Sequence, residues 1–113
     1  MNVYNEAHNL AEAIKQAEEF KEYDRLRREI DADPEVSSMI HDFEQRQVEM
    51  QTKQMMGETV TQEQQENMQR LAMIVMQNPK AANYLQAAMR FSLMMSDVYR
   101  IIGEAAGIQM PNI

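Results

Sequence analysis

Residues 79–106 read PKAANYLQAAMRFSLMMSDVYRIIGEAA, and apolar or aromatic side chains fill most of these positions. They do not fit on one narrow face, and a helix that is apolar around most of its girth is normally buried on several sides. Such a helix is about 40 Å long, whereas a compact chain of this size is only about 35 Å across. We therefore expect a second copy of the chain to cover the overhanging surface, giving a homodimer or a higher oligomer.

The larger side chains of this helix are the candidates for the surface that contacts the second copy or another protein. They are Tyr84, Leu85, Phe91, Met94, Met95, Val98, Tyr99 and Ile102. The chain has 12 methionines, and one interpretation is a soft-metal carrier, because thioethers favour Cu(I). Methionine also fills irregular gaps between helices and suits adaptable interfaces, which is the interpretation that we prefer because these residues are spread along the apolar stripes.

The rest of the chain is also typical of helices. Only three glycines and three prolines interrupt a sequence dominated by strong helix formers. Apolar residues recur at three- and four-residue steps, as on the inward stripe of a packed helix. We predict an all-α protein in one domain, 1–113, folded as an elongated four-helix bundle with a long helical hairpin. The predicted helices span about 5–31, 34–56, 62–77 and 79–106. In the first, the apolar stripe changes phase slightly after Phe20.

Short motifs predict where these helices begin and end. Asp33-Pro34 and Asn78-Pro79 each place a capping side chain before a proline that suits the first helical position. Thr61 is followed three residues later by Gln64, as in a capping box. Two glycines suit the residue that follows a helix, where a left-handed conformation is common. They are Gly57 and Gly107.

The net charge of −7 argues against direct binding of nucleic acid, because phosphate binding relies on Lys and Arg. Acid–base pairs spaced four apart, such as Asp42–Arg46 and Glu49–Lys53, are expected on outer helix faces. No stretch approaches the roughly 18 apolar residues that span a bilayer, and the first residues do not resemble a secretory signal. We therefore expect a cytoplasmic protein without membrane insertion.

The residues that could carry chemistry do not form a recognisable site. The absence of cysteine excludes disulfides and thiolate-bound zinc or iron–sulfur clusters. His8 and His41 lack the glutamate three residues earlier that di-iron helical bundles use. Residues 31–35 resemble the start of a calcium loop, but Val36 occupies the position that requires glycine. We predict no catalytic residue, no metal site and no cofactor.

Seven short segments together resemble a known family. They are LAEAI at 10–14, ADPE at 32–35, QTKQMMGE at 51–58, NP at 78–79, YL at 84–85, RFS at 90–92 and DVYRIIGEA at 97–105. This pattern resembles the YheA branch of the YlbF/YmcA-like family of Gram-positive bacteria and covers nearly the whole chain. These motifs are structural rather than catalytic.

The resemblance implies an all-helical, dimer-forming cytoplasmic protein. The better-known relatives, YlbF and YmcA, are non-enzymatic regulators of competence, biofilm formation and sporulation. They work in a multiprotein complex linked to RNA processing by a membrane-associated ribonuclease. The cysteine-bound iron–sulfur clusters associated with them do not carry over, because this chain has no cysteine.

Our hypothesis is therefore a protein-binding regulatory or adaptor module that forms a homodimer. The alternatives are a purely structural self-associating protein and the methionine-rich metal carrier.

Overall fold

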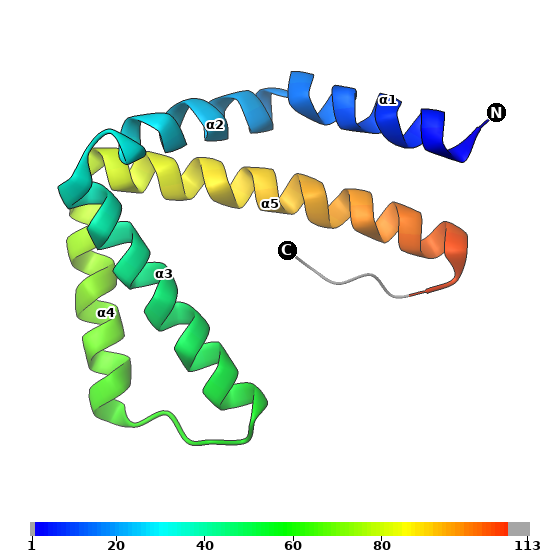
Figure 1. The fold of residues 1–113 in the computed structure, drawn as a ribbon. Coiled ribbons are helices and arrows are strands. Elements are labelled where there is room, and N and C mark those ends of the chain that lie inside the picture. Colours follow the sequence, from blue (N-terminus) through cyan, green and yellow to red (C-terminus); the bar gives the residue numbers. More distant parts are fainter. Residues whose placement is uncertain (1, 109–113) are drawn as a thin grey trace. The chain divides into compact units, whose positions relative to one another are not determined.

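A computed structural model of the chain describes residues 2–108. Within them every regular element is a helix, which confirms the all-α prediction (Figure 1). The helices are α1 (Val3–Gln16), α2 (Glu18–Asp31), α3 (Pro34–Met55), α4 (Gln62–Gln77) and α5 (Pro79–Ala106). This part of the chain therefore has five helices, where four were expected.

The additional helix arises because the first predicted helix is interrupted at Ala17. This residue has extended backbone angles (φ −70°, ψ 141°), and its N–H donates to the carbonyl of Ile14. Lys15 lies in the last turn of α1, whereas Glu18 and Glu19 lie in the first turn of α2. Each charge complements the helix dipole at its own end. Neither glycine nor proline marks the break, so the phase change in the apolar stripe was its main trace in the sequence.

The three predicted N-terminal caps, at Asp33, Thr61 and Asn78, are confirmed, whereas the first helix starts at Val3 and is capped by Asn2. The Asp33 carboxylate accepts the Val36 N–H at 3.4 Å, and Asn78 Oδ1 accepts the N–H of Ala81 at 3.2 Å. The capping box is complete: Thr61 Oγ1 accepts the Gln64 N–H at 3.1 Å, and Gln64 Oε1 accepts the Thr61 N–H at 3.0 Å. These bonds satisfy backbone donors that a helix N-terminus otherwise leaves without an intrahelical partner.

Glycine ends α3 and α5 in the same way. Gly57 (φ 76°) follows α3 and Gly107 (φ 70°) follows α5, and both adopt the left-handed conformation. The next N–H donates back into the helix, from Glu58 to the carbonyl of Lys53 at 2.8 Å in the first case. This is the Schellman arrangement, in which glycine avoids the steric penalty that a Cβ would impose.

The chain divides into two compact units, Met1–Arg27 with Tyr84–Ile113 and Arg28–Asn83. The first contains α1 and most of α2 and α5, and the second contains the α3–α4 hairpin. Most of the buried hydrophobic residues belong to the second unit, where Val75 of α4 is fully buried. The others there are Ile30, Val36, Ile40 and Ala81. Among the described residues of the first unit, the buried hydrophobic ones are Leu26 and Ala87, Gly103 is also buried, and α1 has no buried residue.

Candidate protein-interaction surfaces

An aromatic cluster joins α2 and α5 within the first unit. Phe91 of α5 lies against Tyr23, with ring centroids 5.0 Å apart, and against Phe20 at 5.6 Å. The ring centroids of Tyr84 and Tyr23 are 5.8 Å apart. Next to these residues in the sequence, the Arg90 guanidinium pairs with the Glu22 carboxylate at 3.0 Å. Aromatic pairs of this kind contribute about 0.5–1.5 kcal/mol beyond the area that they bury. Tyr84 and Phe91, both candidates for an intermolecular surface, therefore make contacts inside their own chain.

The remaining candidates lie on α5 with different degrees of exposure. Seven of the eight predicted interface residues are half-buried, and Ile102 is exposed. The half-buried ones are Tyr84, Leu85, Phe91, Met94, Met95, Val98 and Tyr99. Partial burial leaves these side chains with some accessible surface, although the cluster around Phe91 already occupies part of this group.

The most exposed large apolar residues of α5 are different ones. Met89, Leu93 and Ile101 are 66%, 61% and 60% exposed. Met89 and Leu93 are four residues apart and share a face of the helix. The sequence did not single them out, because almost every face of α5 is apolar and its pattern does not say which face a neighbouring helix covers.

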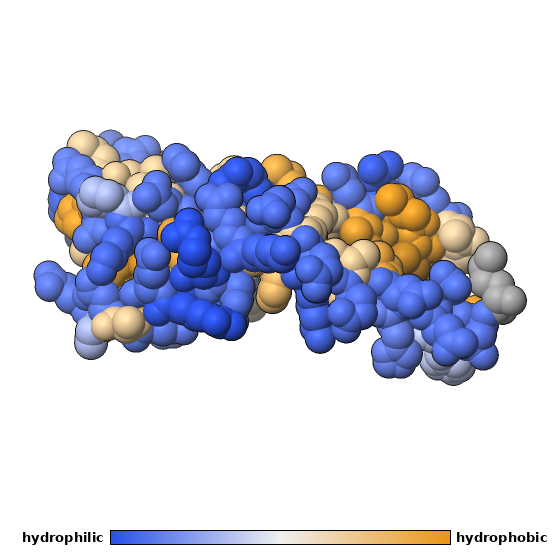
Figure 2. Space-filling model, turned by 90° about the horizontal axis from the view of Figure 1, so that it is seen from above, coloured by the Kyte–Doolittle hydropathy of each residue, from blue (hydrophilic) through white to orange (hydrophobic). Residues whose placement is uncertain are grey.

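Helix α1 exposes apolar residues in the same unit. Val3 and Tyr4 are 80% and 78% exposed, and Leu10 is also exposed. Figure 2 shows hydrophobic residues, in orange, gathered over the part of the molecule that contains α1 and the second half of α5. Contiguous exposed apolar surface is typical of sites that bind other proteins.

A second group of exposed apolar residues belongs to the α3–α4 unit, and most of them are methionines. Met55 and Met56 lie at the end of α3 beside the hairpin loop. Met73, Ile74 and Met76 lie on α4. Each of these side chains is at least 48% exposed, which leaves apolar surface available to an adaptable interface.

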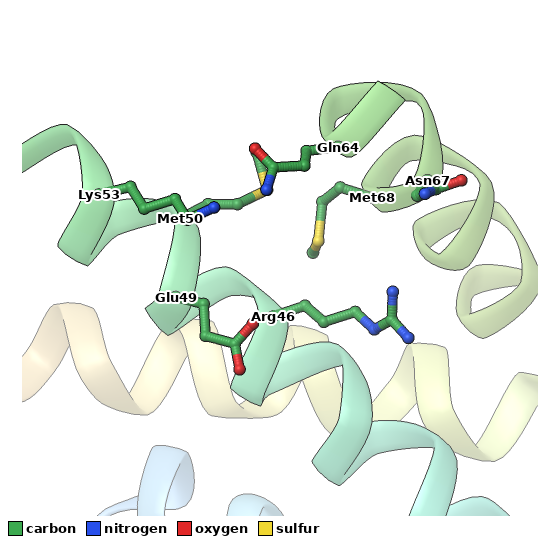
Figure 3. A pocket seen from close by; sticks show the side chains of 7 residues that line it. All are labelled: Arg46, Glu49, Met50, Lys53, Gln64, Asn67 and Met68. Atoms are coloured by element: carbon green, nitrogen blue, oxygen red, sulfur yellow. The ribbon is translucent and has the colours of Figure 1, made fainter. Parts of the chain in front are cut away.

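The same unit contains a cleft between α3 and α4, with a volume of about 150 Å³ (Figure 3). It is lined by Arg46, Glu49, Met50, Lys53, Gln64, Asn67 and Met68. Both helices contribute polar and apolar residues to this lining.

Residues 2–108 contain no cluster of three or more His, Asp or Glu side chains arranged to hold a metal ion. Within the same range, none of the helices is long and apolar enough to cross a bilayer. The Asp33 carboxylate has a clearly shifted pKa. The Val36 N–H that it accepts lowers its pKa below the ordinary value of 3.8, with Lys80 at 3.4 Å acting in the same direction.

The fold and these surfaces describe a small all-helical protein with exposed apolar surface. The family model described as "Control of competence regulator ComK, YlbF/YmcA" matches residues 3–106, so the chain belongs to this family.

Relatives of similar length share the name UPF0342. The UPF0342 protein STH1710 of Symbiobacterium thermophilum is 39% identical over 109 residues, covering 96% of this chain and 97% of the relative. The UPF0342 protein of Caldicellulosiruptor saccharolyticus is 32% identical over 108 residues, covering 96% and 90%. A solved structure, "Protein of Unknown Function (DUF964) from Bacillus stearothermophilus", has a TM-score of 0.78 at 22% identity. It covers 93% of this chain and 92% of its own, and this likeness supports the fold alone.

Proposed function

We propose that the chain is a non-enzymatic regulatory module that acts in the cytoplasm through protein contacts, as a homodimer that presents a surface to a further protein. The apolar surface of α1 and α5 is the observation that carries the proposal. Met89, Leu93 and Ile101 are more than half exposed on one helix, and α1 buries no residue at all. Each large apolar side chain that becomes fully buried contributes about 1.5–3 kcal/mol.

The charges near these residues favour a second copy as the covering partner. Arg100 lies within 3.4 Å of Asp97 and 3.6 Å of Glu104, so the charges on this part of α5 are largely paired within the helix. A two-fold dimer places the same surface on both sides of the interface, and an unpaired charge there would face its own kind. Pairing within the helix reduces this repulsion between the two copies, although each chain has a net charge of −7.

The dimer is tested by sedimentation equilibrium on the full chain and on the double variant Leu93→Gln, Ile101→Gln. We expect the wild type to sediment as a dimer. The dissociation constant of the variant dimer should be at least tenfold higher, a loss of about 1.4 kcal/mol or more of association free energy. Met73→Gln on α4 is the matched control, because Met73 is 64% exposed in the other unit. A wild type that stays monomeric at micromolar concentration would refute the dimer, and large assemblies would favour a purely structural role.

The adaptor role is tested separately, by affinity capture from the native cytoplasm. We expect a protein partner in stoichiometric amount with the wild type. Replacement of Met55 and Met56 by Gln should weaken this capture without changing the dimer, if the methionine surface of the α3–α4 unit binds the partner. Repeated recovery of this chain alone would contradict the adaptor role.

A further inference from the structure

The cleft between α3 and α4 combines an apolar floor with polar groups on both sides. Figure 3 shows the side chains of Met50 and Met68 in the space between the helices, with Lys53 and Gln64 on one side of Met68. Arg46 and Glu49 lie on the other side in the same view. The cleft belongs entirely to the α3–α4 unit, so its geometry follows from one hairpin.

The two amide side chains at the cleft have their oxygen atoms engaged elsewhere. Gln64 Oε1 accepts the N–H of Thr61 at 3.0 Å, and Asn67 Oδ1 accepts from the guanidinium of Arg70 at 3.4 Å. Both partners are donors, which identifies the oxygen side of each amide. The NH₂ group of each amide therefore remains to donate to a bound molecule.

The two cations add further donors. The Nε–H of Arg46 donates to the Asp42 carboxylate at 3.4 Å, which leaves the terminal nitrogens of Arg46 to donate to a bound molecule. Lys53 is half-buried, and within residues 2–108 no carboxylate lies within ion-pair distance of its ammonium group. The expected Glu49–Lys53 pair is therefore not formed, whereas the Asp42–Arg46 pair is.

The residues that line the cleft carry a net positive charge. Arg46 and Lys53 contribute two positive charges, and Glu49 is the single carboxylate among the lining residues. Among the lining residues the surplus is one positive charge, in a chain whose net charge is −7. Asp42, which pairs with Arg46, lies outside the lining, so Lys53 is the lining cation that has no carboxylate within ion-pair distance in residues 2–108. Four donor groups thus line the same cleft as two methionine side chains, and Glu49 is the one carboxylate among the lining residues.

We propose that this cleft binds a carboxylate group carried on a short apolar chain. The methionines contact the apolar chain, and Lys53 with the Gln64 amide, on one side of Met68, donates to the carboxylate. A cavity of about 150 Å³ accommodates a molecule the size of benzene, which corresponds to a chain of about five or six carbons. A single surplus charge matches a monoanion, whereas polyphosphates require several cations.

Two sources supply this chemistry, a free short-chain carboxylic acid and the C-terminal residue of a peptide that ends in an apolar side chain. Methyl NMR of the full chain, carrying ¹³C-labelled methionine, distinguishes them. Met50→Leu and Met68→Leu assign the two reporter signals. The probes are hexanoate and a short peptide ending in leucine, with hexanol, inorganic phosphate and the same peptide amidated at its C-terminus as controls.

We expect at least one of the two carboxylates to shift the Met50 and Met68 signals in a saturable way, and the stronger binder identifies the source. Lys53→Gln should weaken binding about tenfold, the effect of losing one charge-assisted hydrogen bond. Lys53→Met keeps the aliphatic stem and should weaken it equally. Lys21→Gln, in the other unit, removes the same charge and should leave binding unchanged.

Three results would overturn the proposal. The first is the absence of a shift with both carboxylates at tens of millimolar. The second is an equal shift with hexanol or with the amidated peptide, which would show that the carboxylate is not recognised. The third is equal weakening by Lys21→Gln, which would show a response to net charge. None of these readouts depends on the oligomeric state or on capture of a partner, so this proposal and the proposed function fail separately.

Discussion

The ring of Tyr23 stacks on the ring of Phe91, with centroids 5.0 Å apart and planes inclined by 16°. Tyr23 lies in α2 and Phe91 in α5, so this contact joins two helices that are far apart in the chain. It lies in the unit that has few buried residues, and the aromatic cluster therefore accounts for much of the packing between these helices.

Replacing Phe91 by alanine should lower the free energy of unfolding by about 2–3 kcal/mol, less than for a fully buried phenylalanine because the ring is half-buried. Chemical denaturation measures the change. A double-mutant cycle with Tyr23→Leu should give a coupling of about 0.5–1.5 kcal/mol. Gln86→Ala, on an exposed position of the same helix, is the control. A coupling near zero would show that the stacking adds nothing beyond burial.

Replacing Val75 by alanine should destabilise the protein by about 2 kcal/mol, because this side chain is fully buried and its removal leaves a cavity. Met73→Ala, two residues away and 64% exposed, should change stability by much less. Thermal or urea unfolding of both variants makes the comparison. Equal losses would mean that Met73 is also covered in solution, as it would be in an interface.

The stability of the protein should depend on pH through Asp33, which caps the N-terminus of α3. Its pKa is lowered in the folded protein, so the unfolded chain binds this proton more readily. The contribution is therefore fully present above the ordinary value of 3.8 and is lost as pH falls through the lower folded pKa. Asp33→Asn retains a side-chain cap but does not titrate. Melting temperatures measured between about pH 6 and pH 2 should fall less steeply for Asp33→Asn than for the wild type. Parallel curves would contradict this role.

Replacing Gly57 by alanine should destabilise the protein by about 1–2 kcal/mol, the penalty for an L-residue in the left-handed conformation. The space around a Cβ at this position is open, so the effect comes from the backbone alone. Gly57→Asn should lose less stability than Gly57→Ala, because asparagine adopts the left-handed conformation more readily than alanine. Equal stability of the alanine variant and the wild type would mean that the turn rearranges at little cost.

Local chemistry in the sequence was sufficient for most helix ends. The Asp33 cap, the Thr61–Gln64 capping box and Gly57 each act through atoms no more than a few residues away. Such signals do not depend on the rest of the fold, which is why the sequence predicted them. The break at Ala17 was missed because alanine is the strongest helix former and carries no breaking signal.

What the sequence by itself determined is the helical class, the caps and the excess of apolar surface on α5. Only the tertiary structure decided that Phe91 faces Tyr23 while Leu93 is exposed, because a helix apolar on most sides does not show which side its neighbour occupies. The same holds for the cleft. Lys53 and Asn67 lie on different helices, and only the packing of the hairpin brings their donors to one cavity.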